Sequence, residues 1–316
     1  MKKVVTVGGG SGQHVLLHAL STIPDISITA IVSMSDSGGS SGVLRDEYGV
    51  LPPGDILKCL IALSPYQEAR DILQTRFSLH PKFNNHNAGN FLLTFLTERT
   101  NGDFKAAIAA LSEILKIKGE VIPVTLDKNT LCVELANGEK VYGEALIDVP
   151  RVERNEKIVD AFLVPHNGSL QVNPDALRRV EDADVIIISP GDLFTSIIPN
   201  LLFGELAQAL SENSKAQCVY VAPLMTKHGE TNDFTIDEFV TVLQKYVHRP
   251  FDAILLNSQK PSAQVLAQYE KEKATPVVQG SVKSDAIFEY DVLAETSGLV
   301  RHDVTKLAKI LEQLLK

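Results

Sequence analysis

Residues 3–12 read Lys3-Val4-Val5-Thr6-Val7-Gly8-Gly9-Gly10-Ser11-Gly12, a β-branched run that ends in a glycine-rich loop. The apolar stretch from Val15 to Leu20 follows and is typical of a helix. This order of strand, tight loop and helix predicts the opening unit of a parallel α/β fold. Backbone amides of the loop can approach a phosphate closely, since glycine has no side chain. The alternative is a plain strand–helix turn, because Val15 replaces the third glycine of a dinucleotide loop and no Walker ending follows.

The rest of the chain alternates between strand and helix patterns, with two interruptions. Residues 26–34 predict a second strand, 35–54 a long glycine-rich loop, and 55–117 a helical segment. Residues 120–147 alternate around Asn137-Gly138, which predicts two or three antiparallel strands. Further strands are expected at 185–188, 217–222 and 252–257, with helices at 175–183, from 197 to about 210, 235–247, 262–271 and 303–315. We therefore expect one Rossmann-like, doubly wound, mostly parallel α/β domain over 1–316, with an appended antiparallel β-hairpin lobe at about 120–150.

Composition limits the classes of function. The chain has 316 residues, 44% of them hydrophobic and 22% charged, which excludes a disordered chain. Its net charge of −9 argues against generic binding to nucleic acid or anionic membranes. The three cysteines are far apart and lack metal-ligand spacing, and glycines interrupt the first apolar run at once. We expect a cytoplasmic protein without disulfides, zinc, a signal peptide or a membrane span.

Two polar loops follow the second strand pattern. Asp36-Ser37-Gly38-Gly39-Ser40-Ser41-Gly42 can form an anion-binding nest, and Asp36 can hold either a ribose hydroxyl or a Mg²⁺ carried by a phosphate ligand. The alternative is a surface loop. Pro52-Pro53-Gly54-Asp55 opens a helix, so Asp55 is expected either as its N-cap or as a second carboxylate near Asp36 for metal or acid–base chemistry.

Three further segments complete the candidate site. His86-Asn87-Ala88-Gly89-Asn90 precedes an apolar helix, where His86, Asn87, Gly89 and Asn90 either contact ligand or only start the helix. Ser189-Pro190-Gly191-Asp192-Leu193-Phe194-Thr195-Ser196 follows a buried strand, and its amides and the Thr195 and Ser196 hydroxyls suit phosphates or simple capping. Thr226 lies in another strand-end loop, and Arg301 precedes the last helix, where it could reach a phosphate.

These motifs, in this order, resemble the YvcK/CofD-like family, and within it the gluconeogenesis-factor branch. The resemblance covers nearly the whole chain. It implies a Rossmann-like fold with the site at the strand ends. In one branch it implies a Mg²⁺-dependent 2-phospho-lactate transferase. In the branch that this sequence resembles more, it implies UDP-sugar binding, for example of UDP-N-acetylglucosamine, with roles in gluconeogenic growth, cell shape and cell-wall synthesis.

Two departures from the family pattern weaken a catalytic interpretation. Asp36 is followed by Ser37 where the family often has a second aspartate, and Ile56 by Leu57 where it often has arginine. Our leading hypothesis is a nucleotide-sugar-binding regulator with cell-wall or regulatory protein partners. The alternative is a Mg²⁺-dependent transferase with Asp36 and Asp55 at the metal. A dinucleotide-dependent oxidoreductase is disfavoured, and the oligomeric state stays open. Replacing Gly10 or Gly12 by a β-branched residue is expected to abolish nucleotide binding in a folded protein.

Overall fold

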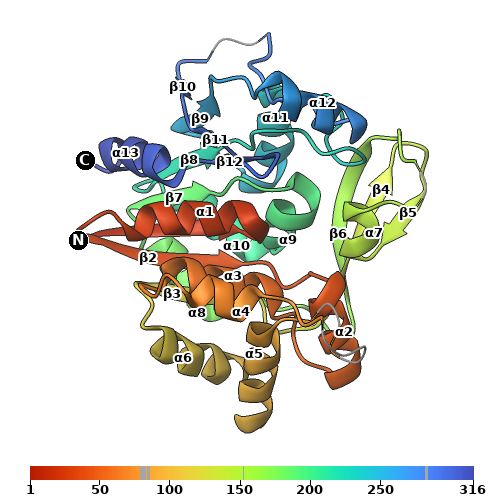
Figure 1. The fold of residues 1–316 in the computed structure, drawn as a ribbon, viewed down its shortest axis with the longest axis vertical. Coiled ribbons are helices and arrows are strands. Elements are labelled where there is room, and N and C mark those ends of the chain that lie inside the picture. The colour runs from red at the N-terminus through yellow and green to blue at the C-terminus, as the bar shows by residue number, and fades with distance from the viewer. Residues whose placement is uncertain (79–82, 84–85, 152, 282–283) are drawn as a thin grey trace.

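The computed structural model describes residues 1–316 apart from 79–82, 84–85, 152 and 282–283. Its centre is a seven-stranded sheet in the order β10-β9-β8-β7-β1-β2-β3, in which each neighbouring pair is parallel (Figure 1). The strands are β1 (Lys2–Gly8), β2 (Ile26–Val32), β3 (Glu120–Pro123), β7 (Val185–Ile188), β8 (Gln217–Val221), β9 (Ala253–Asn257) and β10 (Ile287–Tyr290). This confirms the expected Rossmann-like α/β class.

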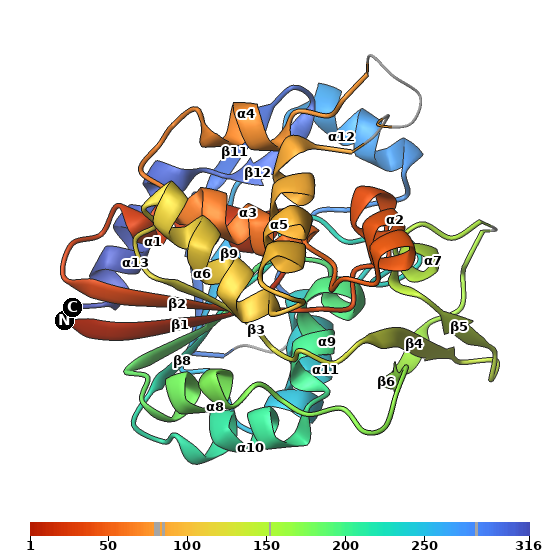
Figure 2. The same ribbon diagram turned by 90° about the horizontal axis from the view of Figure 1, so that it is seen from below.

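Helices cover both faces of this sheet, so its central strands are buried on both faces, and β7 is apolar at every position. Figure 2 shows α1 (Gly10–Ser21), α3 (Gly54–Leu63) and α13 (Val304–Leu314) on one face. The other face carries α8 (Pro174–Glu181), α10 (Gly204–Glu212) and α11 (Ile236–Val247). The remaining helices of the main body are α2 (Gly39–Tyr48), α4 (Ala69–Gln74), α5 (Ala88–Arg99), α6 (Phe104–Leu115), α9 (Ile198–Leu201) and α12 (Ala263–Lys271).

An antiparallel lobe projects from one end of the sheet (Figure 1). It has the strand order β5-β4-β6, formed by β4 (Asn129–Leu135), β5 (Lys140–Tyr142) and β6 (Ile158–Pro165), with the short helix α7 (Glu144–Asp148). The expected hairpin at Asn137-Gly138 joins β4 to β5, and Gly138 has the left-handed φ of 85° that this turn requires. However, β3 belongs to the parallel sheet and not to the lobe, and β6 was not expected.

Two segments expected as loops contain helix. The 35–54 loop includes α2, and Leu193–Ile197 forms the π-helical turn η1 instead of a loop before α9. Glycine and serine weaken a local helix signal, and α2 is held by tertiary contacts described below. The helix expected to run to about 210 is broken between α9 and α10. The expected helical pattern over 79–82 and 84–85 lies outside the described residues.

The C-terminal part of the chain adds strands that the sequence patterns did not indicate. These are β10 at the sheet edge and the hairpin formed by β11 (Leu293–Thr296) and β12 (Leu299–His302). The helices expected near 235–247, 262–271 and 303–315 are all present. Over the described residues no single helix is both long and apolar enough to cross a membrane; η1–α9 and α10, bent by 78°, meet that criterion only as a pair.

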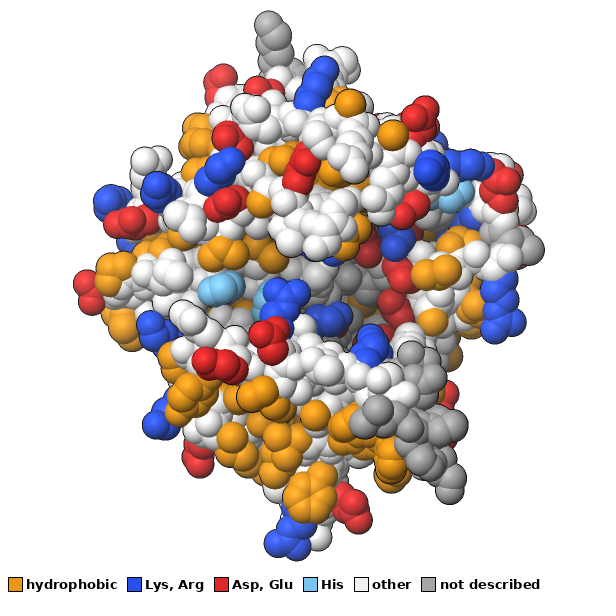
Figure 3. Space-filling view, viewed as in Figure 1, with side chains coloured by type: hydrophobic (Ala, Val, Ile, Leu, Met, Phe, Trp, Pro, Cys, Tyr) orange, Lys and Arg blue, Asp and Glu red, His pale blue; other side chains and the backbone are white. Residues whose placement is uncertain are grey.

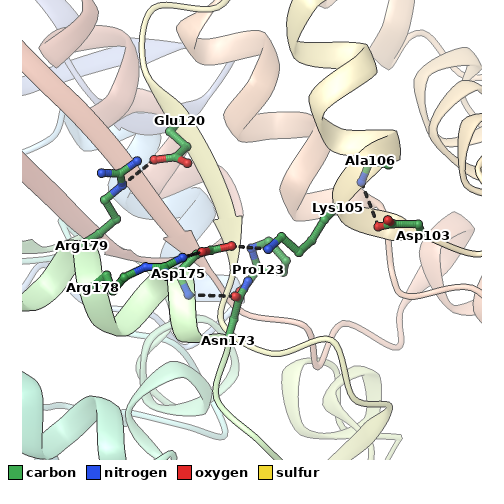
Figure 4. A network of polar contacts seen from close by, with 9 residues as sticks. All are labelled: Asp103, Lys105, Ala106, Glu120, Pro123, Asn173, Asp175, Arg178 and Arg179. Atoms are coloured by element: carbon green, nitrogen blue, oxygen red, sulfur yellow. Dashed lines mark hydrogen bonds and ion pairs between the residues drawn. The ribbon is translucent and has the colours of Figure 1, made fainter.

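A polar network secures the chain where it leaves for the lobe and returns (Figure 4). Asn173, at the start of α8, donates its side-chain amide to the Pro123 carbonyl at 3.0 Å. Arg179 donates to Glu120 at 2.7 Å, and Asp175 pairs with Lys105 of α6. These contacts therefore hold the segment that enters the lobe next to the segment that leaves it, at the β3 edge of the sheet.

Candidate functional site

The strand order reverses between β1 and β7, and this is where the loops after β1 and β7 meet. Ligands of open α/β sheets bind at such a reversal, beyond the carboxyl ends of the strands. The approach of the two loops is close: a Cβ added at Gly12 would lie 2.0 Å from the Pro190 carbonyl oxygen. Gly12 is therefore required for loop-to-loop packing within the protein itself, which differs from the expected role of admitting a phosphate.

The loop after β1 is closed onto α3 by Asp55. The Asp55 carboxylate accepts a hydrogen bond of 2.9 Å from the Gly10 amide. The expected N-cap role of Asp55 is wrong, because Pro53 is the N-cap and Asp55 lies in the first turn of α3. In the structure as it stands, the amide of Gly10 is thus satisfied by a side chain and not left open for a phosphate.

Asp36 and Asp55 come together, as the second reading of Asp55 anticipated. Asp36 accepts a hydrogen bond from the Gly38 amide at 2.9 Å. Burial, with the nearby Asp55 charge as the second cause, raises the pKa of Asp36 above its usual range. The Nζ of Lys58 lies 2.8 Å from Asp55, and the negative charge of Asp55 raises the pKa of Lys58.

Lys58 bears on two expectations. Lys58 places a cation beside the carboxylate pair, although Leu57 occupies the position at which the family often has arginine. Lys58 already neutralises part of the charge of Asp36 and Asp55, and both oxygens of Asp55 have protein partners. The side chains as arranged therefore do not fit a resident Mg²⁺, which would have to displace Lys58.

The His86–Asn90 motif holds α2 in place. The Ser40 hydroxyl lies 2.9 Å from His86 Nδ1 and accepts a hydrogen bond of 3.1 Å from the Asn90 side-chain amide, and all three side chains are buried. Asn87 is the N-cap of α5, since its side chain accepts from the Asn90 amide at 2.7 Å. Gly89 allows close packing, because an added Cβ would lie 2.4 Å from a methyl group of Leu57.

The Thr195 hydroxyl, expected to contact phosphate, is engaged within the protein. Glu230 accepts hydrogen bonds of 3.0 Å from both the Thr195 hydroxyl and the Phe194 amide. Glu230 is fully buried, and this burial, with the Asp192 charge as the second cause, raises its pKa to about 8. Ser196 remains partly exposed and faces the glycine loop, where a Cβ at Gly10 would lie 3.2 Å from its hydroxyl.

A second cluster of carboxyl groups, of which only Glu230 is buried, joins the lobe to the main body. Carboxylate oxygens of Asp148 in α7, Asp192 and Glu230 lie within 4.8 Å of one another. Lys227 Nζ lies 2.8 Å from Asp148 and 3.9 Å from Asp192, so an ammonium group already supplies a positive charge there. Neither Lys227 nor Asp148 was singled out from the sequence, because no local pattern connects the lobe to the loop after β8.

A cleft of about 640 Å³ opens beside these loops, within the range of small-molecule sites. Figure 3 shows this face hollowed near its middle, with basic and acidic side chains along the rim. The expected site residues among those lining the cleft are Ser11, Gly12, Pro190, Gly191, Asp192, Thr226 and Arg301. Asp36, Asp55, His86 and Asn90 are not among the described residues that line it.

The wall formed by the β11–β12 hairpin combines a cation with a neutral histidine. Arg301 is exposed at the rim and donates to the Val300 carbonyl at 2.8 Å. His302 next to it is fully buried, and this burial lowers its pKa to about 4. Thr226 is buried and hydrogen-bonds with Thr275, so it shapes the cleft floor. A larger hollow of about 740 Å³ lies at the C-terminal end of α2, between α5 and the segment that follows β3.

Known proteins resemble the chain over nearly its full length. A family model described as 2-phospho-L-lactate transferase CofD matches residues 4–295. A relative from Nostoc sp. is 39% identical, and the match covers 98% of this chain and 68% of that protein. A Listeria innocua protein named gluconeogenesis factor is 37% identical, with 99% of this chain and 95% of that protein covered. A crystal structure of a UPF0052-family protein from Bacillus halodurans superposes with a TM-score of 0.89 at 34% identity, covering 98% of this chain and 99% of that one.

Proposed function

The chain belongs to the family of the 2-phospho-L-lactate transferase CofD and, within it, to the gluconeogenesis factors, and from this premise we propose that it is a nucleotide-sugar-binding regulator. The ligand is a UDP-sugar such as UDP-N-acetylglucosamine, held in the 640 Å³ cleft. The observation that carries the proposal is the cleft itself. It lies beside the reversal of strand order, has room for a nucleotide sugar, and has Lys227 and Arg301 among its lining residues.

Two cations that line the cleft can bind an anionic ligand, although the carboxylates of Asp148, Asp192 and Glu272 line it as well. Lys227 and Arg301 provide ammonium and guanidinium groups for a diphosphate. The backbone at Pro190, Gly191 and Asp192, just before the start of η1, adds polar groups to the cleft lining. The buried His302 is neutral at pH 7 because its pKa is low, so it adds no charge to the cleft.

Binding without turnover is favoured because the side chains that a transfer reaction would need already form hydrogen bonds within the protein. Asp55 is held by Gly10 and Lys58, and the Thr195 hydroxyl donates to Glu230. The alternative is a Mg²⁺-dependent transferase that moves a phosphorylated hydroxyacid from a nucleotide carrier to an alcohol. The proximity of Asp36 to Asp55 supports that alternative, since a carboxylate pair can serve acid–base chemistry once Lys58 moves away.

The cellular role in this proposal follows from the family. It comprises growth on gluconeogenic carbon sources, together with cell shape and cell-wall synthesis through protein partners. We place the protein in the cytoplasm, where a reducing environment suits Cys59, Cys132 and Cys218, which are all buried and free of disulfides.

Calorimetric titration tests the proposal. The purified chain is titrated with UDP-N-acetylglucosamine, GDP and NAD, each with and without Mg²⁺. Metal-independent binding of the UDP-sugar alone, without turnover, supports the regulator. Metal-dependent binding of GDP with little affinity for the UDP-sugar would overturn it in favour of the transferase, as would release of nucleoside monophosphate from an added nucleotide-activated phosphohydroxyacid only when an acceptor alcohol is present.

A further inference from the structure

The lysine that faces the cleft is shared between the lobe and the main body. Lys227 Nζ pairs with Asp148 of α7 at 2.8 Å and lies 3.9 Å from Asp192. Burial lowers the pKa of Lys227, but the nearby carboxylates outweigh this and raise it, so the side chain is an ammonium group at neutral pH. Lys227, Asp148 and Asp192 all line the same cleft.

The position of Asp148 is set by contacts on both sides of α7. Arg154, itself buried, donates to the carbonyls of Leu146 and Ile147 and also to that of Gly229 in the loop that carries Lys227. At the other end of α7, Glu144 accepts from the Ser37 amide at 3.1 Å and the Ala145 amide donates to the Ser37 hydroxyl at 3.0 Å. The helix therefore bridges the 36–38 and 227–229 loops.

Charge makes this arrangement unfavourable for a diphosphate. Asp148, Asp192 and Glu230 place three carboxyl groups within 4.8 Å of one another. A phosphate that approaches Lys227 meets the negative charge of Asp148, and it competes with that carboxylate for the same ammonium group. Arg154 donates its hydrogen bonds to carbonyls of α7 and of the 229 loop, and so forms the backbone link between these two segments.

We propose that Lys227 is the phosphate-binding cation of the cleft and that Asp148 is a built-in competitor, so that a bound diphosphate separates Asp148 from Lys227 and loosens α7. This inference rests on the proposed function in one respect, namely that the diphosphate belongs to a nucleotide sugar. It couples occupancy of the cleft to the surface of the lobe, because α7 is the part of the lobe that contacts both cleft loops.

The direction in which Asp148→Asn changes ligand affinity distinguishes competition for Lys227 from a purely structural ion pair. Asp148→Asn removes the competing charge, so it should tighten binding of UDP-N-acetylglucosamine and of inorganic pyrophosphate by about three- to tenfold. Lys227→Met should weaken both by more than about tenfold. The double variant should bind as Lys227→Met does, because no cation is then left to release. The affinity for uridine, which lacks phosphate, should be the same for the wild type and for every variant.

The controls are an ion pair away from the cleft and a readout without ligand. Asp291→Asn breaks the pair with Lys306 at 2.9 Å and should leave all affinities unchanged. Thermal unfolding confirms that each variant is folded, and Lys227→Arg keeps the charge if the methionine variant unfolds. Hydrogen exchange of residues 144–149 should be faster in ligand-free Asp148→Asn than in the wild type, and should become faster in the wild type on adding ligand.

The outcomes distinguish this inference from the proposed function. Weaker pyrophosphate and UDP-sugar binding by Asp148→Asn overturns the competitor role while leaving the proposed function in place. If the variants change pyrophosphate affinity as expected but no protein binds the UDP-sugar, Lys227 is supported as the phosphate-binding cation and the proposed ligand is overturned. Absence of pyrophosphate and UDP-sugar binding from the wild type and from Asp148→Asn overturns both.

Discussion

The side chain of Asp55 accepts a hydrogen bond of 2.9 Å from the backbone amide of Gly10, which lies 45 residues earlier in the chain. This contact closes the glycine loop after β1 onto the first turn of α3. The other oxygen of Asp55 holds Lys58 at 2.8 Å. One carboxylate therefore fixes both the loop that was expected to bind phosphate and the nearest cation.

Asp55→Asn should destabilise the protein. The amide oxygen of asparagine can still accept from Gly10, but Lys58 loses its charged partner beside a buried Asp36. We expect the free energy of unfolding to fall by about 1–3 kcal/mol, measured by urea denaturation. Asp46→Asn, which breaks the exposed pair with Arg45, is the control and should cost less than about 1 kcal/mol. Unchanged stability with loss of a Mg²⁺-dependent transferase activity would instead make Asp55 a catalytic residue.

Gly12→Val should lower stability and not only ligand binding. An added Cβ would overlap the Pro190 carbonyl oxygen at 2.0 Å, so the loops after β1 and β7 must separate. We expect a loss of roughly 1–3 kcal/mol or more in the free energy of unfolding. Gly204→Ala is the matched control, because nothing lies within 4 Å of its added Cβ and no left-handed φ is required. A valine variant as stable as the wild type that fails to bind nucleotide would restore the original expectation.

Glu144 should make stability fall at alkaline pH. Burial, with the Asp36 charge as the second cause, raises its pKa from 4.5 to about 8 in the folded state. The folded protein thus holds this proton more tightly than the unfolded chain, so the stabilisation is full below about pH 4.5 and is lost as pH rises through 8. Glu144→Gln should remove about 1–2 kcal/mol of this decline between pH 5 and 9. Denaturation series that run parallel for both proteins would contradict the prediction.

His302 should make the stability of the folded protein fall at acidic pH. Its folded pKa of about 4 lies below the ordinary value of 6.5, because the imidazole is fully buried. The unfolded chain then binds the proton more tightly, so stability is full above about pH 6.5 and falls as pH drops towards 4. His302→Gln should remove up to about 3 kcal/mol of that fall, measured by denaturation at pH 7 and pH 4.5. An equal fall in stability from pH 7 to pH 4.5 in both proteins would contradict this prediction.

Arg301→Ala should weaken UDP-sugar binding. Arg301 lies exposed at the cleft rim on β12, where a charge-assisted bond to a phosphate is sterically open. The loss should be about 1.5–3 kcal/mol, or roughly tenfold to more than a hundredfold in Kd by calorimetry. Arg179→Ala breaks the pair with Glu120 at the far edge of the sheet and should not change the affinity. Identical titration curves for wild type and Arg301→Ala would remove this residue from the site.

The sequence patterns identified the elements that depend on near neighbours in the chain. The glycine loop between β1 and α1, the buried strand β7 and the Asn137-Gly138 hairpin all follow from short-range geometry. Helix and strand periodicity repeats within a few residues, and caps and tight turns are local hydrogen-bonding arrangements. The class of the fold could therefore be predicted from the sequence.

The candidate site was predicted in part, because its loops follow strands but its side chains have distant partners. Asp36 and Asp55 do approach each other, whereas His86 and Asn90 turned out to support α2 through Ser40. The engagement of Thr195 by Glu230 could not be seen, since 35 residues separate them. Lys58 and Lys227 belong to no sequence motif that would have identified them.

By itself, then, the sequence determined that this chain alternates strand and helix and places polar loops after its strands, because those properties arise from contacts a few residues apart. The tertiary structure decided that β3 joins the parallel sheet, that α2 forms within a glycine-rich segment, and that Asp148 of the lobe reaches Lys227. Those outcomes depend on which surfaces of the folded chain meet, and long-range burial and charge, not local periodicity, select them.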